Sequence, residues 1–239
     1  MDNSILFDWA FDTKTVKPLF DSYISDNFFD YFYNKYGVTY HFLYGEYSYK
    51  KFIFQLLSKF YRNDYFIRYS FFGKYLDNKR DVSFFELPLK DSRADIVKIG
   101  NKSTIYEIKT EYDSLDRLLK QVNDYSKCFE YVYIICPEKR ADTVAKIIPK
   151  YCGIITYPSK KAIRFNCKKE ASISPNISNE YLVDLMLKDE LNVFFKSSDK
   201  NAIVENNSPD YISNTFKRAL KKRFLPKMEQ ISDVCASLI

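Results

Sequence analysis

The chain has 239 residues, of which 46% are hydrophobic and 28% charged, with a formal net charge of +6. This composition is ordinary for a globular protein, and the length allows one large core or one domain with a smaller appendage. No run approaches the roughly 18 apolar residues of a membrane span, and the acidic, polar first residues do not resemble a secretory signal. We therefore expect a cytoplasmic protein.

Cysteine and histidine usage excludes several kinds of site. The five cysteines are an odd number without a CxxC pair, which argues against a disulfide framework and against a cysteine zinc site. His41 is the only histidine, which nearly excludes a Ser-His-Asp triad. The 21 tyrosines and 21 phenylalanines show no fixed spacing, so we attribute them to AT-rich codon usage rather than to a base-stacking surface.

The first part of the chain, residues 1–80, is predicted to be mainly helical. Apolar residues recur at i, i+3 and i+4 spacing between residues 49 and 60, which predicts an amphipathic helix over about 47–62. We expect this helix to pack on the sheet formed by the residues that follow.

Residues 92–109 contain two runs rich in β-branched residues around a Gly-Asn turn, which predicts a β-hairpin. With a three-residue loop, Asp95 lies directly opposite Glu107 across the hairpin. Side chains alternate with period two, so Asp95, Glu107 and Lys109 share one face.

Two opposed carboxylates repel each other, and a cation between them would remove that conflict. Mg²⁺ is bound in proteins by one or two carboxylates with water completing its octahedron, and a nearby lysine can position or deprotonate a water nucleophile. The alternative is a solvated hairpin face with scattered charges. A one-residue change of register would also separate Asp95 from Glu107.

A helix and a buried strand are predicted after the hairpin. Asp113-Ser114 is a helix N-cap signal, and Arg117, Gln121 and Tyr125 recur every four residues along one side of this helix. The apolar run 131–136 is typical of a buried strand. The order strand, strand, helix, strand predicts a mixed sheet with a crossover helix.

These motifs together resemble the PD-(D/E)XK nuclease superfamily. The resemblance lies in Ala94-Asp95, in Glu107-Ile108-Lys109, and in the QxxxY element Gln121 to Tyr125, which is shared with the RecB-like branch. The fuller string resembles a largely uncharacterised bacterial and phage nuclease family named from a myxobacterial "sce" open reading frame. The resemblance covers about residues 80–140, and Ala94 replaces the proline of the superfamily name.

The resemblance implies a metal site. Asp95 and Glu107 would be the metal ligands, helped by the main-chain carbonyl of Ile108. Lys109 would orient the attacking water or stabilise the pentavalent phosphate. An upstream acidic residue often completes such sites, and Glu86 is our candidate, with a solvated strand residue as the alternative.

The resemblance also implies contacts with nucleic acid. Gln121 and Tyr125 would support the metal site or contact the nucleic-acid backbone. Arg93 and Arg117 are further candidates for that contact, and the alternative for Arg117 is a surface ion pair, which contributes little energy.

Residues 138–150 have a helical pattern, and 153–157 with 162–165 are predicted to form a second hairpin. A polar connection, 169–179, leads into a last helical region. That region carries six basic residues and no acidic one between positions 217 and 227: Lys217, Arg218, Lys221, Lys222, Arg223 and Lys227. Phe216, Leu220 and Phe224 give the same helix an apolar face. Its basic face can neutralise phosphates, or it can simply be solvated.

We therefore predict an α/β protein with a restriction-endonuclease-like mixed sheet core over 81–168 and helical segments over 1–80 and 169–239. The expected function is Mg²⁺-dependent phosphodiester hydrolysis, with Mn²⁺ as a substitute and DNA as the substrate, although no feature distinguishes DNA from RNA. The alternative is a non-catalytic protein that retains the fold and acts in nucleic-acid binding or in phage–host or defence interactions. Whether the protein forms a homodimer or binds another protein stays open.

Overall fold

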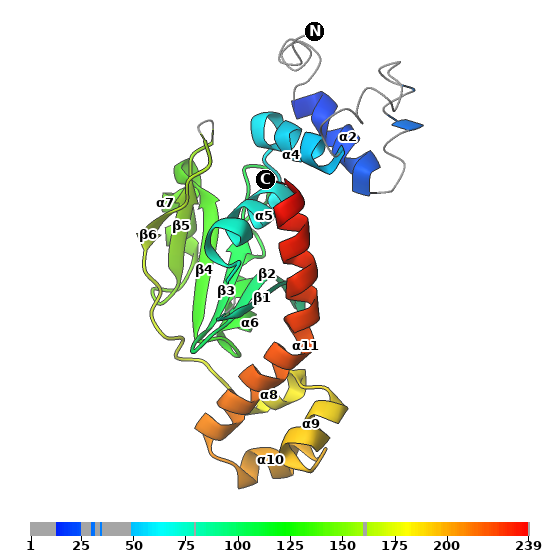
Figure 1. Cartoon of the computed structure of the whole chain (residues 1–239). Coiled ribbons are helices and arrows are strands. Elements are labelled where there is room, and N and C mark those ends of the chain that lie inside the picture. Colours follow the sequence, from blue (N-terminus) through cyan, green and yellow to red (C-terminus); the bar gives the residue numbers. More distant parts are fainter. Residues whose placement is uncertain are drawn as a thin grey trace. The chain divides into compact units, whose positions relative to one another are not determined.

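The computed structural model describes residues 13–24, 30–31, 34, 49–78, 80–159 and 162–238 (Figure 1). His41, the first two residues of the helix predicted over 47–62, and Lys160 in the second predicted hairpin lie outside the described residues. The chain divides into two compact units, residues 1–69 with 233–239 and residues 70–232.

The first unit is helical where it is described. It contains α2 (Thr13–Ile24), α4 (Tyr49–Phe60) and the first part of α5 (Asp64–Tyr75). Helix α4 confirms the predicted amphipathic helix, and it packs against α2. The residues buried in this unit include Val16, Leu19, Ile53, Leu56 and Leu57. The expectation that α4 packs on the sheet stays a prediction.

The second unit is built on a six-stranded sheet whose strands follow the order of the sequence. The strands are β1 (Val82–Leu89), β2 (Ser92–Ile99), β3 (Ser103–Ile108), β4 (Tyr131–Pro137), β5 (Gly153–Tyr157) and β6 (Asn166–Lys169). Neighbours β3, β4 and β5 are parallel, whereas β1, β2 and β6 join antiparallel. The predicted α/β fold is therefore confirmed: a mixed sheet, with helical segments before and after it in the sequence.

The two faces of this sheet are covered by different helices. Helix α6 (Leu118–Ser126), between β3 and β4, brings Tyr125 against Glu107, whereas α5 brings Phe71 against Tyr106. Adjacent residues of a strand point to opposite faces, so α6 and α5 lie on opposite faces. Helix α7 (Ala141–Ile147) joins the next parallel pair, and a right-handed crossover places it on the α6 face.

Two predicted boundaries were wrong. Helix α6 begins at Leu118 rather than at the predicted cap, because the Asp113 side chain accepts hydrogen bonds from Thr110 in the preceding loop. The last strand is Asn166–Lys169 rather than 162–165. Segment 163–165 is held instead by α5, since the Lys74 amine donates to the Ile163 carbonyl.

The last quarter of the chain forms α8 (Asn179–Leu185), α9 (Lys188–Phe195), α10 (Lys200–Asn206) and the long α11 (Pro209–Leu238) (Figure 1). The predicted apolar face of α11 is confirmed: Phe216, Leu220 and Phe224 are buried. Phe224 stacks on Phe84 of β1 with ring centroids 3.7 Å apart. Within the described ranges, none of the helices combines the length and apolar character of a membrane span.

Candidate functional site

Acidic residues of three neighbouring strands share one row of the sheet. The β2–β3 hairpin pairs Ile96 with Tyr106, as the predicted register requires, and the next position places Asp95 opposite Glu107. The β1–β2 pairing, continued through its register in the same way, places Glu86 opposite Asp95. The structure therefore brings all three predicted acidic residues to one level of the sheet.

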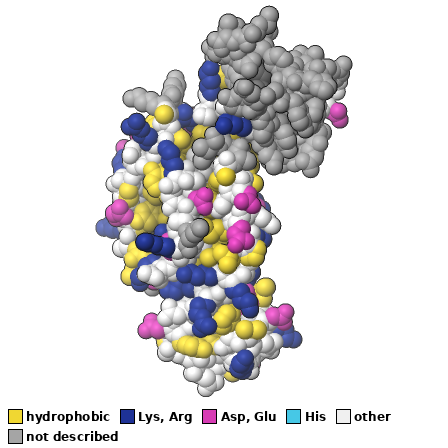
Figure 2. All heavy atoms as spheres, in the orientation of Figure 1, with side chains coloured by type: hydrophobic (Ala, Val, Ile, Leu, Met, Phe, Trp, Pro, Cys, Tyr) yellow, Lys and Arg dark blue, Asp and Glu magenta, His cyan; other side chains and the backbone are white. Residues whose placement is uncertain are grey.

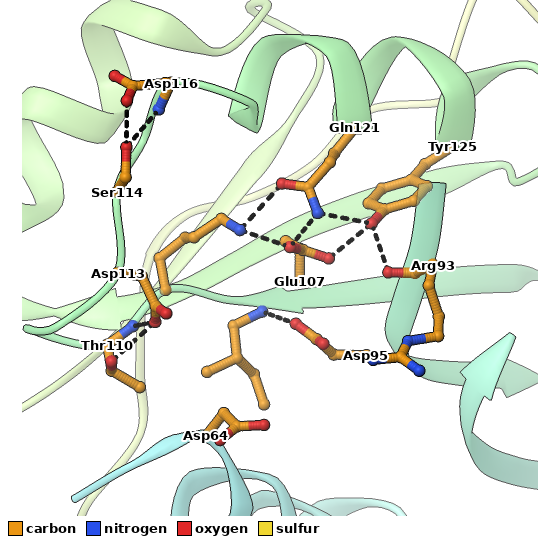
Figure 3. A network of polar contacts seen from close by, with 12 residues as sticks. Asp64, Arg93, Asp95, Glu107, Thr110, Asp113, Ser114, Asp116, Gln121 and Tyr125 are labelled. Carbon is orange, nitrogen blue, oxygen red and sulfur yellow. Dashed lines mark hydrogen bonds and ion pairs between the residues drawn. The ribbon is translucent and has the colours of Figure 1, made fainter. Parts of the chain in front are cut away.

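Glu107 is the centre of a buried polar network (Figure 3). Its Oε1 accepts hydrogen bonds from the Lys109 amine at 2.7 Å and from the Gln121 amide at 2.8 Å. Its Oε2 lies 2.7 Å from the Tyr125 hydroxyl. Glu107 is only 1% exposed, so these partners replace water around its charge.

Helix α6 supplies two of these partners because Gln121 and Tyr125 are one turn apart. The Gln121 Oε1 also accepts from the Lys109 amine at 2.9 Å, so this amide holds the lysine and the carboxylate together. The Tyr125 hydroxyl also lies 2.9 Å from the Arg93 carbonyl and has a single proton to donate. Burial and the nearby Glu107 charge raise the Tyr125 pKa far above its ordinary value, so the hydroxyl remains a donor.

Asp95 binds the end of the neighbouring strand. Its Oδ2 accepts the Ile108 backbone N–H at 2.7 Å, where β3 ends. The next N–H along the chain, that of Lys109, donates to the Ile135 carbonyl of β4 at 2.9 Å. The backbone between Glu107 and Lys109 is therefore held from both neighbouring strands, which orients their side chains.

Glu86 is more exposed than the other carboxylates of its row, the buried Glu107 and the half-buried Asp95. Its side chain is 45% exposed and lies 3.7 Å from the Arg93 guanidinium. Its φ is 60°, a left-handed conformation that costs energy for a residue with a side chain. An exposed ion pair of this length contributes little to stability. Glu86 therefore occupies the outer end of the row, in contact with Arg93.

The loop after Lys109 is organised by contacts that the sequence did not predict. The Arg140 guanidinium donates to the Thr110 carbonyl, and the Asp113 carboxylate accepts from both the backbone and the hydroxyl of Thr110. Arg140 follows β4, and the carboxyl ends of neighbouring parallel strands meet at one edge of a sheet. That position is the signal by which Arg140 could have been found. Arg117 is exposed at the start of α6.

The donors present fit a hard divalent cation. Two carboxylates in register, with a backbone carbonyl between Glu107 and Lys109, are the oxygen ligands that Mg²⁺ prefers, and water normally supplies the rest. Across the residues the structure describes, no group of three or more His, Cys, Asp or Glu side chains is placed to hold a metal.

The basic residues of α11 serve different purposes. Lys217 lies 3.5 Å from Glu130 and donates to the Asn101 carbonyl, and its side chain is 13% exposed. Arg223 pairs with Glu190. Both therefore bind within the fold, which was not expected of a basic surface. Arg218, Lys222 and Lys227 are exposed and Lys221 is half-buried, and the Arg218 guanidinium lies over the Phe194 ring.

Residues 66–235 match the family described as Bacteriophage P4 protein cII, and the chain belongs to this family. It is similar to "Protein cII" of Enterobacteria phage P4, with 28% identity over 100 residues, or 41% of this chain. The matched part spans 38% of that relative's length. The chain is also similar to a solved structure, the SPO1766 protein of unknown function from Silicibacter pomeroyi. The match covers 67% of this chain and 90% of that protein, with 12% identity and a TM-score of 0.36.

Proposed function

We propose that this protein is a metal-dependent nuclease of the PD-(D/E)XK type that hydrolyses phosphodiester bonds in DNA. One observation carries the proposal: the buried Glu107 contacts Lys109, Gln121 and Tyr125, while Asp95 occupies the opposed register position. Glu107 and Lys109 come from a strand end and Gln121 and Tyr125 from the helix that follows, yet they meet in one network. A solvated hairpin face would leave them exposed and apart.

The carboxylates of Asp95 and Glu107 and the Ile108 carbonyl would hold Mg²⁺, which would offset charge on the scissile phosphate. Lys109 is 9% exposed and donates to both Glu107 and Gln121, so its amine is confined beside the carboxylate. From there it can hold a water for in-line attack. Gln121 and Tyr125 act as positioning residues, because they contact the groups that would do the chemistry.

Nucleic acid would approach the open end of this row. Arg93 is 67% exposed beside Glu86, and Arg117 is exposed at the start of α6. These residues, together with Arg218, Lys221 and Lys222 on α11, are the candidates for phosphate contact. Phosphate contacts of this kind fix register without selecting sequence. RNA is not distinguished from DNA by any of them.

A second function is supported by the same network. Lys109, Gln121 and Tyr125 already satisfy the Glu107 carboxylate without a metal. A closed network of this kind can be structural, and it favours a protein that binds nucleic acid or a phage–host or defence partner without turnover.

The test is a cleavage assay of the purified full chain on plasmid, linear and single-stranded DNA and on RNA, in Mg²⁺, Mn²⁺ or EDTA. We expect DNA cleavage with either metal and none in EDTA. The matched variants are Glu107→Gln and Glu205→Gln, the latter an exposed glutamate of α10. Cleavage that survives Glu107→Gln would assign it to a contaminant. Tight binding without cleavage by the wild-type chain would favour the second function.

A further inference from the structure

A pocket of about 270 Å³ lies on the sheet face opposite Glu107. Five of the residues that line it are aromatic: Phe71, Tyr75, Tyr106, Tyr133 and Phe165. Leu76, Lys98, Ile155, Cys167 and Glu170 complete its lining. All of these residues belong to the second unit, so the pocket is formed within one compact body.

The topology explains why this part of the sheet is open. The parallel crossovers place α6 and α7 on the Glu107 face. The opposite face receives the C-terminal part of α5, where Phe71 packs on Tyr106 and Phe72 on Phe85 of β1. Figure 2 shows hydrophobic side chains gathered at the surface over the sheet on this face. The pocket lies between the C-terminal end of α5 and strands β4, β5 and β6.

The aromatic walls are held in place before any ligand binds. The Tyr133 ring lies against the backbone of Gly153, where a Cβ atom would come within 2.3 Å of the ring. Only glycine allows this close approach. Tyr106 stacks beside Tyr133 with centroids 5.7 Å apart and an interplanar angle of 22°. The two rings are therefore nearly parallel neighbours in the lining of the pocket.

The opposite wall is fixed by α5. Phe165 meets Phe71 edge to face, with centroids 5.1 Å apart. The Tyr75 hydroxyl donates to the Phe165 carbonyl at 3.3 Å, which ties this segment to the helix. Tyr75 itself remains 49% exposed. Phe71 in turn lies 4.9 Å from Tyr106 between ring centroids, so the aromatic lining runs from the strands to α5.

The rim carries one negative and one positive group. Glu170 is exposed and accepts from the Tyr133 hydroxyl at 2.7 Å through Oε2. Burial and the Glu170 hydrogen bond raise the Tyr133 pKa to about 12, so this donor persists at neutral pH. The Lys98 amine lies 3.1 Å from Asp81 and is 30% exposed on its side chain. The rim thus offers a carboxylate acceptor and an ammonium donor.

We propose that this pocket binds a single nucleobase, stacked on Tyr106 and Tyr133 and recognised at its edge by Glu170 and Lys98. The volume lies below the usual range for drug-sized ligands, so it suits one ring system rather than a large molecule. Unpaired bases are bound in proteins by stacking on aromatic side chains and by hydrogen bonds to their edges.

The two charged groups rank the bases. Guanine presents two N–H donors beside a carbonyl oxygen, which match a carboxylate and an ammonium group. Cytosine has an amino donor and a carbonyl but only one ring, and adenine has no carbonyl. We therefore expect guanine to bind best and adenine worse. This inference does not depend on the metal site, which lies on the other face.

The base can belong to a free nucleoside or to an unpaired position in a strand. Calorimetric titration of the full chain with guanosine, cytidine and adenosine tests the pocket itself. Titration with a single-stranded pentanucleotide, with a central guanine or with an abasic site there, separates the two sources. Weaker binding of the abasic strand identifies a strand ligand. Guanosine affinity equal to that of the strand identifies a free ligand.

Two exposed positions allow variants that leave the core unchanged. Tyr75→Ala removes one wall and should weaken every nucleoside at least about 5-fold. Glu170→Gln keeps the stacking surface and should remove the preference for guanosine over adenosine. Matched controls are Tyr211→Ala, a tyrosine of α11 with 45% exposure, and Glu205→Gln. Both should bind as the wild type does.

Three results would overturn the proposal. They are the absence of any nucleoside binding at millimolar concentration, equal affinities in wild type and in both pocket variants, or binding of tetramethylammonium in preference to guanosine. The melting temperature of each variant shows whether the fold is retained. Because Glu170 is exposed, Glu170→Gln remains informative even if Tyr75→Ala is destabilised.

Discussion

Glu107 and Glu130 are both buried glutamates bonded to lysine, yet their surroundings differ in charge. Glu130 accepts from the Lys102 amine at 2.9 Å and from the Ser103 N–H at 2.8 Å, and Lys217 lies 3.5 Å away. Two lysines thus surround one carboxylate. At Glu107 one lysine shares the site with two uncharged donors, and the Asp95 carboxylate occupies the next strand.

This comparison separates a structural carboxylate from a candidate metal ligand. Burial disfavours the charge of Glu130, but the Ser103 N–H, Lys102 and Lys217 outweigh it and lower the Glu130 pKa. Its contacts join the start of β3 to α11. Burial alone therefore does not indicate a functional site. The informative quantity is the balance of carboxylates and cations around the buried group.

The largest expected effect is on cleavage. Asp95→Asn and Glu107→Gln each remove a negative metal ligand, so Mg²⁺-dependent activity should fall by more than about 100-fold. Without metal, Asp95→Asn should be as stable as the wild type or slightly more stable, because the repulsion between opposed carboxylates is gone. Glu107→Gln should lower stability, because it leaves the buried Lys109 amine without its negative partner. Cleavage rates and melting temperatures in EDTA measure the two effects. Full activity in Asp95→Asn would reject Asp95 as a ligand.

Lys109 should affect turnover rather than binding. Lys109→Met removes the amine beside Glu107 but keeps an unbranched side chain of similar length. Because its proposed role lies in the transition state, kcat should fall about 10- to 100-fold while DNA affinity stays nearly constant. Single-turnover kinetics and binding measured in Ca²⁺ separate the two. A loss confined to affinity would make Lys109 a phosphate contact instead.

Glu130→Gln should leave cleavage unchanged, unlike Glu107→Gln. It leaves Lys102 and Lys217 without their shared negative charge, which should destabilise the fold by about 1–3 kcal/mol. Denaturant unfolding at neutral pH measures this free energy. Cleavage per folded molecule should be unchanged. A loss of cleavage per folded molecule in Glu130→Gln would erase the distinction drawn between the two centres.

The same comparison predicts a pH dependence. The folded state lowers the Glu130 pKa below its ordinary value of 4.5, so its stabilising contribution is present above that value. It is lost as the pH falls through the lower, folded pKa. The difference in unfolding free energy between wild type and Glu130→Gln should therefore shrink below about pH 4.5. A difference that stays constant down to pH 3 would contradict this assignment.

The smallest effect concerns α11. Lys217 binds Glu130, whereas Lys221 is half-buried and Lys222 is exposed. Replacing Lys221 and Lys222 with glutamine should weaken DNA binding and reduce the salt slope by about 0.9 per lost phosphate contact. Lys217→Gln should lower stability and leave the slope unchanged. The reverse result would place the phosphate contact at Lys217.

Local patterns predicted the elements that carry the Glu107 network. Period-two alternation and the Gly-Asn turn gave the register that places Asp95 opposite Glu107, and four-residue spacing placed Gln121 and Tyr125 on one side of a helix. These patterns depend on neighbouring residues, so they are visible without the fold. Their limits are equally local: the Asp113 cap failed because its carboxylate binds Thr110 in the loop.

The sequence by itself therefore determined the hairpin register, the helix that faces it, and the apolar face of α11. Only the tertiary structure decided which charged side chains form ion pairs within the protein, as Lys217 does with Glu130. It also decided which aromatic residues line one pocket. The residues that line this pocket are scattered between Phe71 and Glu170 without regular spacing. Such contacts depend on how distant elements pack, and no local periodicity records that packing.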